Sequence, residues 1–376
     1  MSGAIRPPDP LPVPGGAGGA AQEGGPGAAA VTSERKRDHL RLALDGPVAS
    51  SATTGLERLR LRARALPERD LDQVGLAIDV LGHRLAAPLL LSCMTGGTGE
   101  AGPVNRALAA AAQIHGVAFG LGSGRVLLED SSMAPTFGVR DVAPDVLLLA
   151  NLGAVQLRTY SAADCARLVQ LCEADVLVLH LNAVQEAVQP SGDTGFGGLL
   201  RRIAQVCTAL EVPVLAKEVG FGMAPEDVAA LLDAGVAGVD VAGAGGTNWA
   251  RVEGLRDDRA GRIAAAFADW GWPTATCVAA AAPLCRSRGA LLIGSGGLVD
   301  GVDAAKVLCL GADLAAVGRG VLAAGAQGPE AAAAAVGELV EQLRIATWAC
   351  GAGSVAELDR GCLLPAEGFS GPAGAG

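Results

Sequence analysis

The feature that most constrains the fold of this chain is a series of eight short apolar runs between residues 88 and 320. Each run is followed by a segment with the amphipathic, Ala- and Leu-rich pattern of a helix. Continuous apolar strands that are separated by helical crossovers indicate a parallel sheet covered on both faces. The runs are LLLSCM (89–94), VAFGLGS (117–123), VLLLANL (146–152), VLVLHLN (176–182), PVLAKEV (213–219), GVDVAG (238–243), ALLIGSGG (290–297) and DLAAVGRG (313–320).

Eight strand–helix units over roughly 230 residues fit an α/β TIM (β/α)8 barrel, which we predict for residues 88–350. A doubly wound sheet remains an alternative, because counting strands does not show closure. Residues 31–87 are expected to form an N-terminal extension with a basic helix (33–44) and a short hairpin. The Gly-, Pro- and Ala-rich residues 1–30 are predicted to be a disordered tail, and 351–376 a partly disordered C-terminal segment.

Composition excludes several classes of function. The net charge of −10 argues against nucleic acid as the main partner, so an anionic substrate would need a local basic pocket. Nine cysteines without a C-x-x-C pair indicate reduced thiols in a cytoplasmic protein rather than a disulfide framework or a zinc site. Apart from Ala-rich helical stretches, no apolar run reaches eighteen residues without a charge or turn signal, so we expect no membrane span.

Polar or glycine-rich residues follow every predicted strand. Because TIM barrels carry their functional groups at the carboxyl ends of the strands, we expect these residues to surround one site. Glycine clusters after the last two strands (IGSGG and VGRG) suggest a phosphate site. Lys217 lies in an apolar strand, where burial without an anionic partner is costly. We prefer a cofactor contact for it; an ion pair with Glu218 or Asp240 is the alternative.

The fourth strand continues into HLNAVQEAVQPSGD (180–193), the densest group of polar residues. His180 and Asn182 share a strand face, and Gln185 and Glu186 follow on the loop or first helical turn. One carboxylate beside amides suits Mg²⁺, which is held by one or two carboxylates together with substrate phosphates. A charge at a helix start is the simpler alternative for Glu186.

Taken together, these motifs resemble the type 2 isopentenyl-diphosphate isomerases, which are FMN-dependent TIM barrels of isoprenoid biosynthesis. The resemblance covers about residues 33–345, and HLNxxQE together with MTGG, KEVG and GGT in this order is highly specific. The matching pieces are ERKRDHL (34–40), LSCMTGGTGEAGPVNRALA (91–109), FGLGSGR (119–125), NLGAVQL (151–157), LHLNAVQEAVQPSGD (179–193), PVLAKEVGFG (213–222), GVDVAGAGGTNWARVE (238–253), WGWPTA (270–275) and IGSGGLVDGVDAAKVLCLGAD (293–313).

The resemblance implies a role for each matching position. For FMN it implies Cys93, Met94, Thr95, Ser123, Asn151, Lys217, Thr247, Gly296, Gly297, Leu298, Gly318 and Arg319. For the prenyl diphosphate substrate it implies Arg35, Lys36, Ser123, Gly124, Arg125 and Gln185, with His180, Asn182 and Gln185 as the catalytic groups and Glu186 on Mg²⁺.

The implied reaction is a 1,3-proton shift between isopentenyl and dimethylallyl diphosphate, with reduced FMN as acid and base and NADPH as the reductant of the flavin. The family also implies a homo-oligomer, tetrameric or octameric. This chain departs from the family at Ala242, Ala244, Leu298-Val299-Asp300 and Ser191. These departures leave room for a related enzyme acting on a different prenyl substrate.

Two further alternatives remain. A 2-hydroxy-acid oxidase would need a catalytic histidine late in the barrel, and no histidine follows His180. A barrel kept only for binding or as a scaffold is disfavoured, because Lys217, His180, Asn182, Gln185 and Glu186 are all retained.

Overall fold

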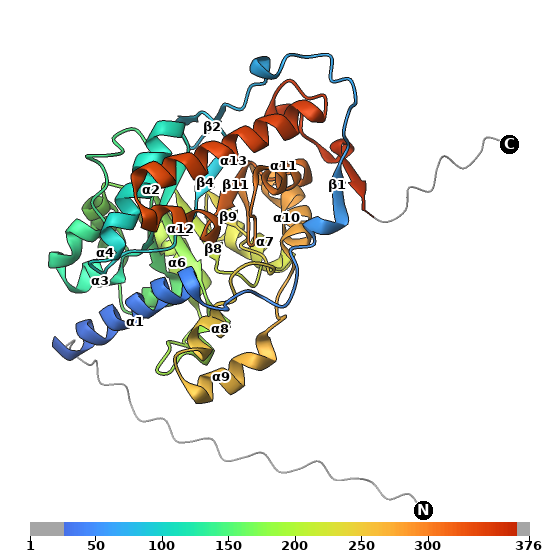
Figure 1. Cartoon of the computed structure of the whole chain (residues 1–376). Coiled ribbons are helices and arrows are strands. Elements are labelled where there is room, and N and C mark those ends of the chain that lie inside the picture. The colour runs from blue at the N-terminus through green and yellow to red at the C-terminus, as the bar shows by residue number, and fades with distance from the viewer. Residues whose placement is uncertain (1–25, 367–376) are drawn as a thin grey trace, which may run out of the picture.

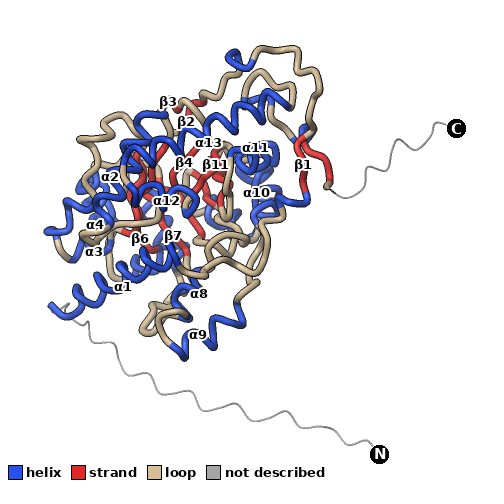
Figure 2. The backbone as a smooth tube through the Cα atoms, in the orientation of Figure 1, coloured by secondary structure: helices blue, strands red, loops and turns tan. Residues whose placement is uncertain are grey.

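A computed structural model describes residues 26–366 of the chain, with side chains from Arg35 onward. Eight strands form a closed barrel in the order β10-β11-β4-β5-β6-β7-β8-β9, and each neighbouring pair is parallel. Helices surround the barrel (Figures 1 and 2). The predicted TIM barrel is therefore confirmed, and the doubly wound alternative is wrong because the sheet closes on itself.

All eight predicted strands are present in shortened form. The barrel strands are β4 (Leu89–Leu91), β5 (Ala118–Ser123), β6 (Leu148–Gly153), β7 (Val176–Leu181), β8 (Val214–Glu218), β9 (Gly238–Asp240), β10 (Leu291–Ser295) and β11 (Leu314–Val317). The helices are α1 (Pro26–Asp45), α2 (Ala101–His115), α3 (Arg125–Glu129), α4 (Ala162–Cys172), α5 (Ala183–Val188), α6 (Leu199–Ala209), α7 (Pro225–Asp233), α8 (Trp249–Gly254), α9 (Asp258–Ala264), α10 (Thr274–Arg288), α11 (Gly301–Leu310), α12 (Arg319–Gln327) and α13 (Pro329–Ala349).

Side chains alternate between two apolar layers along each strand. In β7, Val176 and Val178 belong to the cluster inside the barrel, whereas Leu177 and Leu179 pack outward against the helices. This alternation follows from the two-residue period of a strand. It explains why the runs are continuously apolar: both faces of every strand are buried.

The predicted hairpin closes the amino-terminal end of the barrel. Its strands, β2 (Ile78–Val80) and β3 (His83–Leu85), pair antiparallel. Val80 and Leu85 belong to the same interior cluster as Ala118 and Val176, which begin their strands. This end of the barrel is therefore filled with apolar side chains, which leaves the opposite end for the chemistry.

The N-terminal helix α1 lies across the carboxyl end of the barrel (Figure 1) and is anchored there by Lys36, which donates to the carbonyl oxygens of Ser123 and Gly96. The helix begins at Pro26, within the residues 1–30 for which a tail was predicted. The rest of that tail, residues 1–25, lies outside the described residues.

At the other end of the chain, β12 (Leu363–Pro365) pairs antiparallel with β1 (Leu59–Leu61). The C-terminal segment is therefore ordered to this point, and residues 367–376 lie outside the described residues. The nine cysteines are free thiols. Within residues 26–366, no helix has the length and apolar character that a membrane crossing requires.

Replacing Leu85 with alanine tests the role of the hairpin as a plug. Leu85 is 3% exposed within the interior cluster, so Leu85→Ala should lower the free energy of unfolding by about 2–5 kcal/mol. Leu66→Ala, at a leucine that is 67% exposed, is the matched control and should change it by less than about 0.5 kcal/mol. If urea unfolding gave the same loss of unfolding free energy for both variants, the hairpin would not close the barrel through Leu85.

Candidate active site

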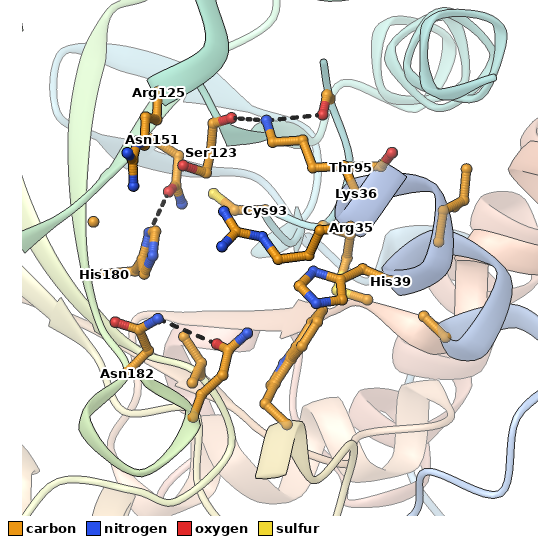
Figure 3. A pocket seen from close by; sticks show the side chains of 18 of the residues that line it. Arg35, Lys36, His39, Cys93, Thr95, Ser123, Arg125, Asn151, His180 and Asn182 are labelled. Carbon is orange, nitrogen blue, oxygen red and sulfur yellow. Dashed lines mark hydrogen bonds between the residues drawn. The ribbon is translucent and has the colours of Figure 1, made fainter. Parts of the chain in front are cut away.

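A pocket opens at the carboxyl ends of the strands, beneath α1, and contains most of the predicted site residues (Figure 3). Side chains from α1 enter it from one side, and side chains at or just after the carboxyl ends of β4 to β8 enter it from the barrel. The predicted residues that line it are Arg35, Lys36, Cys93, Met94, Thr95, Ser123, Arg125, Asn151, His180, Asn182, Gln185, Glu186 and Lys217.

The cations of α1 are held at the pocket by the barrel itself. Lys36 Nζ donates to the carbonyl oxygens of Ser123 (2.7 Å) and Gly96 (3.1 Å). It also lies 5.6 Å from the ring centroid of Phe137, within cation–π range. Burial, and after it repulsion from Arg35, lowers the pKa of Lys36 to about 7. The pocket thus holds an ammonium that an incoming anion would stabilise.

His180 is neutral in this pocket. Burial lowers its pKa to about 4, and the positive charges of Lys217 and Lys36 contribute further. Its Nδ1 lies 2.7 Å from Asn151 Oδ1, as drawn in Figure 3. Because this amide oxygen can only accept, the proton is assigned to Nδ1, and Nε2 is left as an acceptor.

The short helix α5 and its N-cap carry the two predicted amides, Asn182 and Gln185, and the predicted metal ligand, Glu186. Asn182 Nδ2 donates to Gln185 Oε1 (3.2 Å) and to Glu186 Oε1 (3.0 Å). The backbone N–H of Asp193 donates to Glu186 Oε2 at 2.7 Å. Asn182 Oδ1 is buried and has no hydrogen-bond partner among the described residues. Because buried polar atoms are normally satisfied, this orphan points to a group that binds here.

Glu253, in α8, is a residue of the site that the sequence did not reveal. Its carboxylate is fully buried and accepts from Gln185 Nε2 (2.9 Å) and Arg256 (3.0 Å), and it lies 2.8 Å from His39 Nε2. Burial acts to raise the pKa of Glu253, but the contacts with His39, Gln185 and Arg256 outweigh it and lower the pKa. The carboxylate therefore joins α1, α5 and α8 behind the pocket.

No pattern in the sequence signals this role, because Glu253 lies on a helix that follows a strand rather than at a strand end. Gln189 extends the same network. With its amide oriented to satisfy its neighbours, its nitrogen donates to Glu253 Oε1 (3.1 Å) and its oxygen accepts from Arg35 (2.9 Å). His39, Gln156, Gln189 and Trp249 line the pocket as well.

The structure distinguishes the two ion pairs considered for Lys217. Its ammonium lies 3.4 Å from Asp240 Oδ2, and it donates to the backbone carbonyl of Glu218 rather than to its carboxylate. The Glu218 carboxylate instead accepts from the backbone N–H groups of residues 219–222. Burial raises the pKa of Glu218 to about 7 despite these donors. Lys217 thus forms the pair with Asp240 and also reaches the pocket.

The remaining predicted residues do not line this pocket: Gly124, Thr247, Gly296, Gly297, Leu298, Gly318 and Arg319. Gly124 caps α3 beside the pocket, and Thr247 forms a backbone bridge to Ala49. The Arg319 guanidinium donates to the carbonyl oxygens of Ala43 (3.0 Å) and Gly46 (3.2 Å) at the end of α1. The side chain placed by sequence at a phosphate is thus engaged with a helix C-terminus, where a cation is favourable.

The glycine loops after β9 and β10 meet each other closely. A Cβ atom on Gly246 would lie 2.5 Å from the backbone nitrogen of Gly297, and Gly297 itself has a φ of +76°. Only glycine allows this approach and this backbone conformation. The loops therefore present backbone rather than side chains, as a phosphate-binding cradle requires.

Comparison with known proteins identifies a family whose members this chain resembles over most of its length. Residues 180–365 match the FMN-dependent dehydrogenase family. The chain is 48% identical to an isopentenyl-diphosphate delta-isomerase of Synechococcus sp., covering 88% of this chain and 96% of the relative. It is 47% identical to the enzyme of that name in Stutzerimonas stutzeri (88% and 96% covered) and 40% identical to that in Methanosarcina mazei (87% and 90%).

Among solved structures, the chain is similar to mandelate oxidase bound to (S)-2-phenylpropionate. The TM-score is 0.61 and the identity 22%, covering 89% of this chain and 97% of the oxidase. At this identity the likeness shows the barrel fold alone.

The lowered pKa of Lys36 predicts that anion binding depends on pH. Sulfate keeps a constant charge near neutrality, so its affinity should fall roughly tenfold between about pH 6.5 and about pH 8.5 as Lys36 loses its proton. His180 stays neutral over this range and does not contribute. Calorimetric titration of Lys36→Met should remove most of this dependence; an equal dependence in the variant would contradict the role of Lys36.

Proposed function

This chain belongs to the type 2, FMN-dependent isopentenyl-diphosphate delta-isomerase family, and we propose that it interconverts isopentenyl and dimethylallyl diphosphates in isoprenoid biosynthesis. The reaction moves one proton from C2 to C4 of the allylic system with no net oxidation. The observation that supports it best is the pocket itself, where Arg35, Lys36 and Arg125 converge in a protein of net charge −10. Such a local cluster of cations suits a diphosphate.

Mg²⁺ is proposed as the second partner of the diphosphate, with Glu186 as the protein ligand. Residues 26–366 contain no group of three or more His, Cys, Asp or Glu side chains placed to hold a metal. A site with one carboxylate is typical of Mg²⁺ that is held largely by substrate phosphates and water. Asn182 and the backbone of Asp193 orient the carboxylate of Glu186 toward this role.

The residues of the barrel also fit FMN. The buried Asn182 Oδ1 has no partner among the described residues, and the glycine loops after β9 and β10 present backbone rather than side chains, as a phosphate-binding loop requires. Cys93, Met94, Thr95, Ser123, Asn151 and Lys217, the positions proposed for FMN, surround the pocket. When bound in its reduced form, FMN supplies the group that adds and removes the proton at the alkene, and NADPH is proposed as its reductant.

The side chains of this chain then bind and orient the substrate. Neutral His180 offers Nε2 as an acceptor, and Gln185 is held by hydrogen bonds from Asn182 and to Glu253. A neutral amide is a weak proton carrier, so Gln185 is proposed to position the alkene while the flavin carries the proton. Helix α1 covers the mouth and limits the access of water.

Two properties of the protein in the cell complete the proposal. Nine free thiols support a reducing compartment, the cytoplasm. Exposed Leu200, Trp270 and Trp272 surround one apolar groove and support self-association into a homo-oligomer.

An anaerobic assay with FMN, NADPH, Mg²⁺ and isopentenyl diphosphate tests the activity. We expect dimethylallyl diphosphate to form only when the flavin is reduced. A protein that binds FMN but forms no dimethylallyl diphosphate would refute the proposed substrate and favour a related enzyme of another prenyl compound. A protein without affinity for FMN would refute flavin chemistry altogether.

Glu186→Gln separates the metal site from the cofactor site. The substitution removes the charge that is proposed to hold Mg²⁺, so the Mg²⁺-dependent affinity for substrate should fall by about tenfold or more, while FMN stays bound. Glu226→Gln, at an exposed carboxylate of α7, is the control and should change neither. Loss of FMN from Glu186→Gln, measured by absorbance after gel filtration, would show that the metal site has been misplaced.

A further inference from the structure

A buried ion pair joins two neighbouring barrel strands near their carboxyl ends. Lys217 of β8 and Asp240 of β9 are register partners on neighbouring strands, and their side chains lie 3.4 Å apart. The residues are 7% and 2% exposed. Asp240 Oδ2, the oxygen that faces Lys217, accepts no hydrogen bond from any described residue.

The other oxygen of Asp240 is fixed by its own strand end and by the next strand. Asp240 Oδ1 accepts from the Ser295 hydroxyl and from the backbone N–H of Ala242 at 3.3 Å. Ala242 has a φ of +34°, a conformation that is rare outside glycine. Its N–H bond to Asp240 therefore helps to hold the turn that leads into the glycine loop 243–246.

No other carboxylate in the described part of the chain forms an ion pair with Lys217. Glu218 is adjacent in sequence, but its Oε2 is taken up by four backbone N–H groups. A buried ammonium without a partner is strongly unfavourable, because it loses its hydration and gains nothing in return. Lys217 also donates to the backbone carbonyl of Glu218, so Asp240 is its one charged partner among the described residues, and the direction of the ammonium depends on that carboxylate.

We propose that Asp240 is a positioning residue for the flavin. Its carboxylate holds the Lys217 ammonium toward the pocket and stabilises the glycine loop that follows β9. The proposal rests on the use of FMN in the proposed function. It gives one buried carboxylate two connected tasks, one at Lys217 and one at the backbone of Ala242. Neither task requires Asp240 to touch the substrate.

A double-mutant cycle on FMN affinity tests the first task. Asp240→Asn keeps the shape of the side chain and removes its charge, and should weaken FMN binding by about tenfold or more in fluorescence titration. In a Lys217→Met background, Asp240→Asn should weaken FMN binding by less than about threefold. The ammonium through which Asp240 is proposed to act is already absent from that background. Ser295→Ala, which removes one support of Asp240, should weaken FMN binding by a smaller factor.

Asp175→Asn is the matched control. Asp175 pairs with Arg140 at 2.8 Å and accepts from the backbone N–H of Leu148 at the opposite end of the barrel. It should lower thermal stability without changing FMN affinity or the visible spectrum of the bound flavin. Asp240→Asn should shift that spectrum, which a purely structural role would leave unchanged.

Unchanged FMN affinity in Asp240→Asn would overturn the proposal. So would an equal loss of FMN affinity when Asp240→Asn is made in the wild-type protein and in the Lys217→Met background. If Asp240→Asn does not fold, additive effects of Ser295→Ala and Lys217→Met would overturn it as well. A wild-type protein that isomerises isopentenyl diphosphate while the cycle fails would refute only the role of Asp240. A coupled cycle in a protein without isomerase activity would refute only the proposed function.

Discussion

The buried charge at the mouth of the barrel is the constraint on which the rest of this structure depends. Lys36, Arg35 and Lys217 are drawn out of bulk water in a protein that is acidic overall. Each needs a partner. Lys36 donates to the carbonyl oxygens of Ser123 and Gly96, and Lys217 pairs with Asp240. Arg35 donates to the reoriented amide of Gln189, within the field of the Glu253 carboxylate. An anionic substrate completes this arrangement, because it supplies negative charge that compensates the buried cations.

Much of the fold could be predicted from the sequence, because the barrel buries both faces of its strands. Strands that are buried on both faces are continuously apolar in sequence. The polar residues at the ends of these runs then indicate where the pocket lies. His180, Asn182 and Lys217 could be placed in this way. Counting strands could not show that the sheet closes, since closure depends on the pairing of the last barrel strand, β11, with the first, β4, which lie far apart in sequence.

The parts of the site that lie on loops and helices could not be predicted in the same way. Glu253 reaches Gln185 only because α8 folds back over α5, which no local pattern signals. Arg319 follows a glycine at a strand end, as a phosphate ligand would, yet its side chain reaches the last carbonyls of α1. At two of the departures from the family, Ala244 is fully buried and Val299 is exposed to solvent.

In the proposed reaction, a proton moves along a prenyl diphosphate in this pocket without net redox change. Incubation of the reduced holoenzyme with isopentenyl diphosphate in deuterated water, followed by NMR and flavin absorbance, distinguishes this reaction from redox chemistry. We predict that deuterium enters the dimethylallyl product while the flavin stays reduced over many turnovers. Product formation that oxidises one flavin per molecule, or reduced flavin without any exchange, would contradict it.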